Sequence, residues 1–456
     1  MSSIHSVTPR SSGVHLAKPA SSRLLLGLSR LDLVGVSVGG LIGLLVGVSL
    51  GSGLGSIVSF IAFPGFGLLL SRIKVFGQSP IEALLRSARL PFVNRRRRLP
   101  TSGLNAIWQH SRKRMPQVGF ALFGTTPGAG FITNHRRGAK VFRVATNPLW
   151  AVEPDLQLSQ GRTWSQALVA LSDGAPRDLS IVVRSDVIED SASTSEDEAG
   201  LFVELDQLIR SGSYRLETTV SVAFGESQRR LKRIQTRVDS SARLLVSQLA
   251  GEAKNPLLEL LSDAYLERVA SNWLLGDANW YSCDSSSRAG QRVMEFWDRI
   301  VVDDTKIACL YVKDWPNGEV SPGFMDSVLT PVAPRRSVMM EFRPISPEIA
   351  RRKTRSKVSE AMAQGRLRRS TGYLEDAGDE ASMGENLRIE GELARGAGLF
   401  GYGCTVVVYS RSSVDLELDV RRCVSLAASS GITLERAYGR QLETFLASFV
   451  TGGSIR

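Results

Sequence analysis

The chain contains one long apolar stretch near its N-terminus, LDLVGVSVGGLIGLLVGVSLGSGLGSIVSFIAFPGFGLLLSRIK, residues 31–74. Asp32 is its only acid, and no basic residue appears before Arg72. Residues 33–50 and 54–70 would form helices of about 27 and 25 Å, close to the ~30 Å hydrocarbon core of a bilayer. The stretch therefore predicts a transmembrane helical hairpin over residues 31–75 that turns near Gly51.

Basic residues flank this hairpin on both sides. Arg10, Lys18, Arg23 and Arg30 precede it, and Arg72, Lys74 and the run Arg95–Arg98 follow it. Because positive residues mark the cytoplasmic side, we expect a two-pass protein of the bacterial inner (cytoplasmic) membrane with both termini in the cytoplasm. A cleaved signal peptide and a glycine-rich helix pair inside a soluble protein are the alternatives. The late start and the length of the apolar region favour the retained anchor.

Glycines recur at every fourth position of the first predicted span. They are Gly35, Gly39, Gly43 and Gly47. Small residues at this spacing let another helix approach closely, so we expect membrane helix packing along this face, against the second span or against another subunit. A chance match in a glycine-rich span is the alternative.

The positive charge is concentrated in the N-terminal part of the chain. The net charge is +11, with 18 basic and 2 acidic residues up to Lys140 (+16) and 38 basic and 43 acidic residues after it (−5). Arg95, Arg96, Arg97 and Arg98 are therefore expected to contact anionic lipid at the membrane surface. Direct contact with nucleic acid is the alternative for this run.

The remaining sequence indicates five segments. We expect a disordered basic tail (1–30), the hairpin (31–75), a basic juxtamembrane helix and linker (76–140), a first α+β subdomain (141–255), and a second one (256–456) with a charged helical hairpin at 346–394. Strands are predicted at 140–145, 179–184, 214–224, 306–312, 337–342, 400–409 and 432–438. Helices are predicted at 163–171, 201–210, 227–249, 256–272, 288–298, 346–364, 383–394, 413–428 and 439–449. The predicted fold class is an N-terminal transmembrane helical hairpin plus an α+β cytosolic region of two ferredoxin-like halves.

The sequence lacks the usual signatures of catalysis. All four histidines, at positions 5, 15, 110 and 135, precede the predicted α+β region, which excludes a histidine-based triad or metal site within it. The segment GTTPGAG, residues 124–130, is followed by Phe131 and Ile132, whereas a phosphate-binding loop requires Lys and then Ser or Thr. We therefore expect no enzymatic activity, no catalytic residue, no metal and no cofactor. A membrane-tethered enzyme with a site assembled at a subunit interface is the alternative.

Three segments carry a resemblance to a known family. They are RSVMMEFRPISP (336–347), GLFGYGCTVVV (398–408) and LERAYGRQLETF (434–445), supported by RTWSQAL (162–168), IVVR (181–184) and VKDWP (312–316). The chain resembles actinobacterial conjugal-transfer membrane proteins that fuse a PrgI-like membrane hairpin to a domain similar to the N-terminal part of VirB-type transfer ATPases. The family offers no catalytic or ligand residues to assign to this chain.

The resemblance implies a structural role in a type IV secretion-like apparatus for conjugative DNA transfer. The chain would present a cytosolic platform that docks a separate VirB-type motor ATPase, together with other subunits of the apparatus. The alternative is an EccE-like membrane component of a type VII secretion system, which shares the layout of an N-terminal hairpin and a soluble tail.

Overall fold

The computed structural model describes most of the C-terminal third of the chain, several strands and helices before it, and isolated positions between residues 40 and 87. The described ranges are 14–15, 98–99, 120–124, 129–133, 137–144, 163–171, 179–189, 214–225, 231–249, 258–260, 291–302, 304–316, 319–320, 323–330, 334–370 and 377–449.

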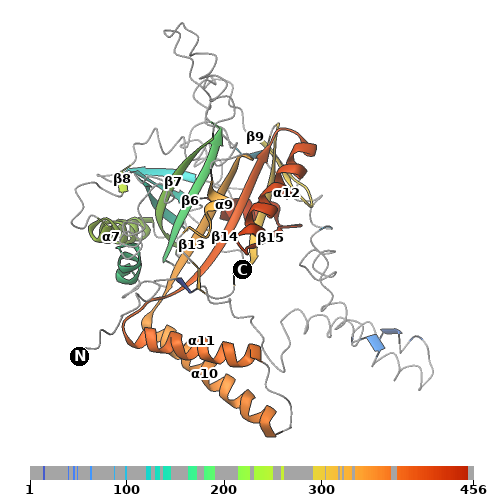
Figure 1. The fold of residues 1–456 in the computed structure, drawn as a ribbon. Helices are drawn as coiled ribbons and strands as arrows, with labels where there is room; N and C mark the ends of the chain where they lie inside the picture. The colour runs from blue at the N-terminus through green and yellow to red at the C-terminus, as the bar shows by residue number, and fades with distance from the viewer. Residues whose placement is uncertain are drawn as a thin grey trace, which may run out of the picture.

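One large antiparallel sheet dominates this structure (Figure 1). Its described strands are β2 (Arg98–Leu99), β3 (Phe120–Gly124), β4 (Ala129–Thr133), β5 (Arg137–Val144), β6 (Leu179–Glu189), β7 (Tyr214–Gly225), β8 (Leu258–Leu260), β9 (Gln291–Glu295), β10 (Ile300–Val302), β11 (Thr305–Asp314), β13 (Arg336–Ile345), β14 (Leu399–Ser410) and β15 (Thr433–Arg436). The spatial order is β2-β9-β10-β11-β14-β13-β6-β7-β5-β4-β3, with β15 beside β11 and β8 beside β5. A separate pair joins β1 (Val14–His15) to β12 (Glu319–Val320).

The sheet runs without a break through both predicted subdomains, so the expectation of two ferredoxin-like halves is wrong. Strand β6 pairs with β13 along a continuous register, from Arg336–Val187 to Phe342–Ile181. β6 precedes residue 255 and β13 follows it. Backbone hydrogen bonds therefore fuse the two segments at the centre of a single sheet instead of closing each one on its own.

One face of the sheet carries the apolar cores. Residues directly opposite in a ladder share a face, and Met340 lies opposite both Val183 and Cys404. On this face residues 163–171, which are helical, and α7 (Leu231–Leu249) cover β5, β6 and β7. Beside them α9 (Asp326–Leu329) and α12 (Ser413–Ser429) cover β11, β13 and β14.

The opposite face contacts the last helix, α13 (Gln441–Ala447). Side chains alternate between faces along a strand, so Arg184 and Asp186 of β6 and Ser337 of β13 point away from the apolar cores. The Arg184 guanidinium reaches the Ser448 carbonyl immediately after α13. This second face is therefore also buried, and it mixes apolar side chains such as Val182 and Val407 with the charged pair, which is unusual for the centre of a sheet.

Two helices connect the paired central strands β13 and β14 along the chain. Helix α10 (Pro347–Ser370) begins with proline in its first turn, and α11 (Ala377–Ala394) returns the chain to β14. Gly396, at φ 94°, ends α11, and the Ala397 and Gly396 amides bond the Glu392 and Leu393 carbonyls as in a Schellman motif. Figure 1 shows both helices beyond the end of the sheet, and they lie within the range of the predicted charged hairpin.

The predicted helix at 288–298 is wrong. Residues 291–295 form strand β9, which pairs with β10. Val293 and Glu295 are both buried, with Met294 between them less so, so the period is two and not 3.6. The apolar spacing of this short run is compatible with either period, and pairing in the sheet decides between them. In the predicted helix at 256–272, residues 258–260 are strand β8.

Among the residues that the structure describes, no helix is both long and apolar enough to cross a membrane. The longest described helix, α10, contains eight Lys and Arg among its 24 residues. This finding corrects the transmembrane hairpin of the predicted fold class and the predicted two-pass inner-membrane localisation. Residues 31–75 themselves lie outside the described residues, apart from isolated helical positions.

Candidate functional site

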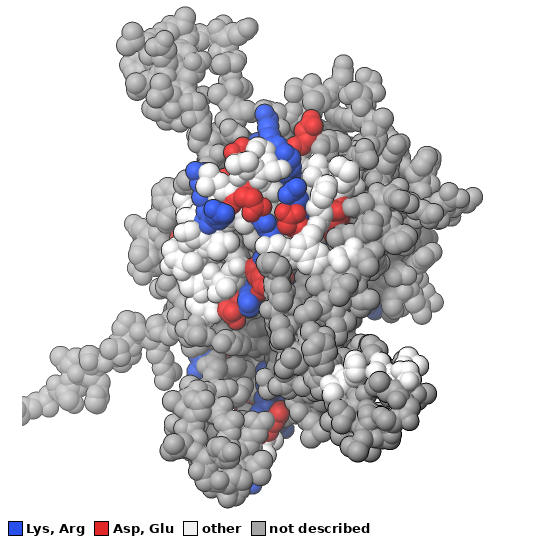
Figure 2. Space-filling model, turned by 90° about the vertical axis from the view of Figure 1, so that its right-hand side faces the viewer, with Lys and Arg blue, Asp and Glu red and all other residues white. Residues whose placement is uncertain are grey.

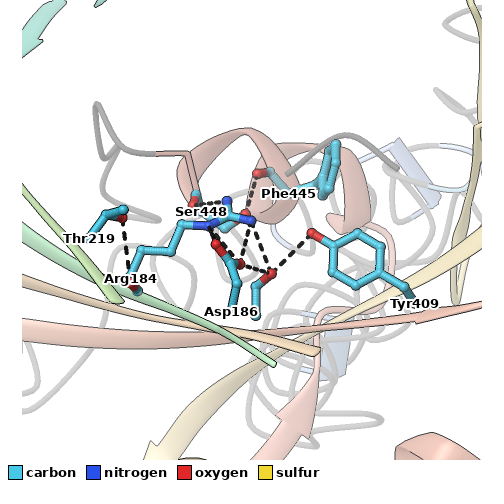
Figure 3. Close-up of polar contacts among 7 residues, drawn as sticks. Arg184, Asp186, Thr219, Tyr409, Phe445 and Ser448 are labelled. Atoms are coloured by element: carbon cyan, nitrogen blue, oxygen red, sulfur yellow. Dashed lines mark hydrogen bonds and ion pairs between the residues drawn. The ribbon is translucent and has the colours of Figure 1, made fainter. Parts of the chain in front are cut away.

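A buried polar network occupies the second face of the sheet, between β6, β13, β14 and the end of α13 (Figure 3). The Arg184 guanidinium donates to both Asp186 carboxylate oxygens, with Nε 2.9 and 3.0 Å away, and to Ser337 Oγ at 3.0 Å. Ser337 Oγ donates to Asp186 Oδ1, and Tyr409 Oη lies 3.4 Å from the same hydroxyl. Arg184 Nη1 also donates to the Ser448 carbonyl at 3.3 Å. We call these five residues the Arg184 network.

The electrostatics of this network follow from its burial. Its four residues on the sheet are at most 5 % exposed. Burial alone would lower the pKa of Arg184, but the Asp186 carboxylate, with Tyr409, outweighs it, and the net effect raises that pKa. Burial raises the pKa of Tyr409 to about 12, against the lowering effect of the Arg184 charge. Arg184 is therefore a permanent cation and Tyr409 a neutral phenol at physiological pH.

Further buried contacts fix α13 to the sheet at its other end. The Cys309 amide donates to Gln441 Oε1 at 2.8 Å, and Gln441 Nε2 donates to the Cys309 and Ala437 carbonyls. The carboxylate of Glu295, which is 7 % exposed, accepts from the Leu442 amide at 2.9 Å. A carboxylate at this position satisfies a free amide of the first helical turn and is favoured by the helix dipole.

These contacts indicate that the Arg184 network has a structural role inside the protein. A substrate could not reach Ser337 or Tyr409 without displacing the structure that covers them, because both side chains are only 3 % exposed. Each polar group instead bonds another part of the chain, which holds α13 against β6, β13 and β14. Within the described part of the chain, no three His, Cys, Asp or Glu side chains gather as a metal site would require.

The exposed surface of α12 has the character of an interaction site. The helix begins at a Ser412 cap, whose hydroxyl accepts from the Val414 amide at 3.2 Å. Its inner face buries four side chains in the sheet, Leu416, Val420, Cys423 and Ala427. Its outer face leaves Val414 79 % and Leu418 47 % exposed. These two residues are one helical turn apart and share a face, and we call them the α12 patch.

Charged side chains surround the α12 patch. Asp415 and Arg421 on the same helix are exposed, and Arg422 lies 3.6 Å from the Asp419 carboxylate. Burial raises the pKa of Asp419, against the lowering effect of Arg422. Figure 2 turns this side of the molecule toward the viewer and shows basic and acidic side chains interspersed with uncharged surface. An apolar centre with a charged surround is the usual make-up of a protein-binding surface.

The site residues expected from the sequence fall mostly outside the described residues. Gly35, Gly39, Gly43 and Gly47 lie there, as do Arg95, Arg96 and Arg97. Arg98 is the first residue of β2, and its backbone pairs with Arg292 of β9. The relative positions of these residues therefore lie outside what the structure describes, and helix packing at the glycines and lipid or nucleic-acid contact at the arginines stay predictions.

Sequence reasoning missed both features of this site. Arg184 and Asp186 stand two residues apart in the strand sequence LSIVVRSDVIE, and this spacing places both side chains on the same face. Opposite charges at that spacing inside an apolar strand were the available signal of a buried pair. For the α12 patch the signal was Val414 and Leu418 at i and i+4, outside the stripe of buried residues on the same helix.

Neither family models nor curated proteins provide a match to this chain.

Proposed function

We propose that this protein is a non-enzymatic docking subunit of a type IV secretion-like apparatus for DNA transfer, and that its large sheet is a platform for a separate motor ATPase. The observation that carries the proposal is the α12 patch, where Val414 and Leu418 are 79 % and 47 % exposed on a well-anchored helix. The resemblance of the sequence to conjugal-transfer proteins supports the identity of the partner.

The energetics favour binding at this patch. Burying a fully exposed aliphatic side chain contributes about 1.5–3 kcal/mol, so these two partly exposed side chains together can supply roughly 2–4 kcal/mol. The Ser412 cap and the buried inner face hold α12 in place, so little conformational entropy is lost on binding. Asp415 and Arg421 beside the patch would set the orientation of the partner through complementary charges.

Co-purification tests the proposal. Full-length tagged protein is isolated from its native cell by gentle lysis, and the retained proteins are identified by mass spectrometry. We expect a hexameric P-loop ATPase of the transfer type to be retained. The double variant Val414→Asp/Leu418→Asp should weaken this association by roughly 100-fold, because two buried contacts are replaced by desolvated charges.

The control is Leu244→Asp, which places one carboxylate on α7 at a leucine that is 38 % exposed. This variant should retain the ATPase like the unmodified protein. The proposal is wrong if no motor ATPase is retained, or if the α12 double variant and the Leu244→Asp control retain it equally well.

A further inference from the structure

Helix α10 presents a dense group of positive charges to solvent. Arg351, Arg352, Lys353, Arg355 and Lys357 are all exposed. They span about 9 Å along the axis at 1.5 Å per residue. Counted over the whole helix, eight Lys and Arg stand against Glu348 and Glu360, a net charge of +6. At 3.6 residues per turn, Arg351, Arg352 and Arg355 share one side of the helix, whereas Lys353 and Lys357 lie on another. We call the five exposed residues together the α10 basic face.

The neighbouring helix α11 offsets part of this charge, because it carries five Asp and Glu against one Arg, and the two helices together keep a net charge of +2 (+6 for α10 and −4 for α11). Arg355 Nε lies 3.5 Å from Glu390 Oε1 of α11, but the Arg355 side chain is 74 % exposed. Surface pairs of this kind are worth at most about 1 kcal/mol and are weakened by salt. Among the described residues, none forms an ion pair with the other four residues of the α10 basic face. The face therefore carries a local excess of positive charge that a polyanion could neutralise.

The packing of α10 favours a phosphate backbone over a lipid surface. Ala350, Thr354 and Val358 are 0, 4 and 7 % exposed and recur every four residues. These residues form the least polar stripe of the first turns, and it is already buried within the protein, where α10 lies beside α11. A helix that binds in the bilayer interface needs a free apolar face to insert below the head groups. A helix that binds phosphates needs only exposed Arg and Lys.

The position of the helix also suits a long, regular partner. α10 and α11 lie between β13 and β14 in the chain and extend beyond the end of the sheet (Figure 1). The five side chains of the α10 basic face are exposed there. Phosphate contacts from Arg and Lys position a protein on nucleic acid without reading sequence. We propose that the α10 basic face binds the phosphate backbone of nucleic acid without sequence preference. This surface is separate from the α12 patch, so the proposal does not depend on the docking function.

Salt-dependent binding of the full chain to DNA tests this inference. Fluorescence anisotropy with a labelled 30-base-pair duplex is measured over a range of NaCl concentrations. Because Arg351, Arg352 and Arg355 share one side of the helix, about three phosphate contacts are expected, and they predict a slope of log K against log salt of about −3. The variant Arg351→Ala/Arg352→Ala/Lys353→Ala removes two of these three residues and should reduce the steepness by about 2 and the affinity in 0.1 M salt by about 10-fold or more.

A charge-matched control removes three exposed bases elsewhere, Arg243→Ala/Lys313→Ala/Arg411→Ala. It should change the slope by less than about 1, because these residues are scattered and outside α10. Circular dichroism and the melting temperature verify folding of both variants, and the milder Arg351→Gln/Lys357→Gln provides a second variant of the α10 basic face.

Three results would overturn the inference. The first is no binding of the unmodified chain to the duplex in 50 mM salt, and the second is equal affinity and slope in the α10 triple variant and the control. The third uses vesicles containing 30 % phosphatidylserine as a separate arm. If these vesicles bind in an α10-dependent manner while the duplex does not, the α10 basic face recognises lipid and not nucleic acid.

Discussion

Removing the Asp186 carboxylate should be among the most destabilising single changes in this protein. Arg184 is fully buried, and its ion pair with Asp186 has an N–O distance of 2.7 Å. In Asp186→Ala the guanidinium would lose its carboxylate partner and keep uncharged ones, including Ser337 Oγ and the Ser448 carbonyl. Leaving one charge of a buried pair uncompensated costs about 3–5 kcal/mol. We expect the free energy of unfolding to fall by about 4 kcal/mol.

The assay is urea denaturation at pH 7 followed by circular dichroism, with calorimetry as a second probe. For a cooperative unit of 150–250 residues, a loss of about 4 kcal/mol lowers the melting temperature by roughly 8–16 °C. Asp304→Ala, at an exposed position in the loop between β10 and β11, is the control and should change stability by less than about 0.5 kcal/mol.

A double variant distinguishes two causes of instability in Asp186→Ala: the unpaired charge left on Arg184, and the loss of the stabilisation that the Arg184–Asp186 pair itself provides. Arg184→Met/Asp186→Leu removes both charges and replaces them with apolar side chains of similar length, and such replacements of a buried pair are often neutral or stabilising. We therefore expect the double variant to recover most of the stability lost in Asp186→Ala. A cost below about 1 kcal/mol for Asp186→Ala would refute the claim that Arg184 is desolvated. A double variant as unstable as the single one would show that the pair itself stabilises the fold.

Two more predictions concern backbone geometry and alkaline pH. Gly439 has φ 65°, and a Cβ added there would lie 2.7 Å from Trp297 Cζ3, whereas a Cβ added at Gly431, with φ 71°, would have its nearest neighbour at 3.5 Å. In urea denaturation Gly439→Ala should therefore cost clearly more stability than the roughly 1 kcal/mol expected for Gly431→Ala. Equal costs would contradict the contact argument. Burial raises the pKa of Cys404 and of Cys423 from 9.0 to about 12. The folded state therefore binds more protons than the unfolded state between these values, and the stabilisation present below pH 9 is lost as pH rises toward 12, by up to about 1.4 kcal/mol per pH unit for each thiol. Between pH 7 and about pH 10.5 the denaturation midpoint should therefore decrease less in Cys423→Ala than in the unmodified chain. An identical decrease in the two proteins would contradict this assignment.

The strands of this fold were largely accessible from the sequence. The runs predicted at 179–184, 214–224, 337–342 and 400–409 are confirmed as parts of β6, β7, β13 and β14. They are rich in Val, Ile and Thr, which favour the pleated and buried environment of a sheet. The prediction ended β6 at Arg184, five residues early, because a charged side chain is normally a sign that a buried strand has ended.

Which of these strands pair with one another could not be predicted from the sequence. β6 and β13 are neighbours although Arg184 and Ser337 are 153 residues apart. Local composition specifies a strand but not its partner, since the choice depends on non-local packing of entire faces. The Arg184 network shows the limit most clearly, because its five members come from three strands and the end of α13.

The apolar segment at 31–74 shows the converse limit. Its composition fits a lipid environment, yet no described helix meets the length and apolarity needed for a membrane span. The candidate sites based on that segment, including Gly35 and Gly39, lie outside the described residues. By contrast, the α12 patch could be assigned only once the burial of each face of the helix was known. Val414 and Val420 are both valines of α12, but the first is exposed and the second is buried.

The most direct test of the docking function is photo-crosslinking at the α12 patch in living cells. A photoreactive amino acid replaces Leu418 in the full chain, the cells are irradiated, and the crosslinked product is identified by mass spectrometry, with the same substitution at Leu244 as the reference. The docking function predicts a covalent adduct between position 418 and a P-loop motor ATPase, and no such adduct from position 244. Irradiation that gives no ATPase adduct at position 418, or gives equal adducts at both positions, would contradict it.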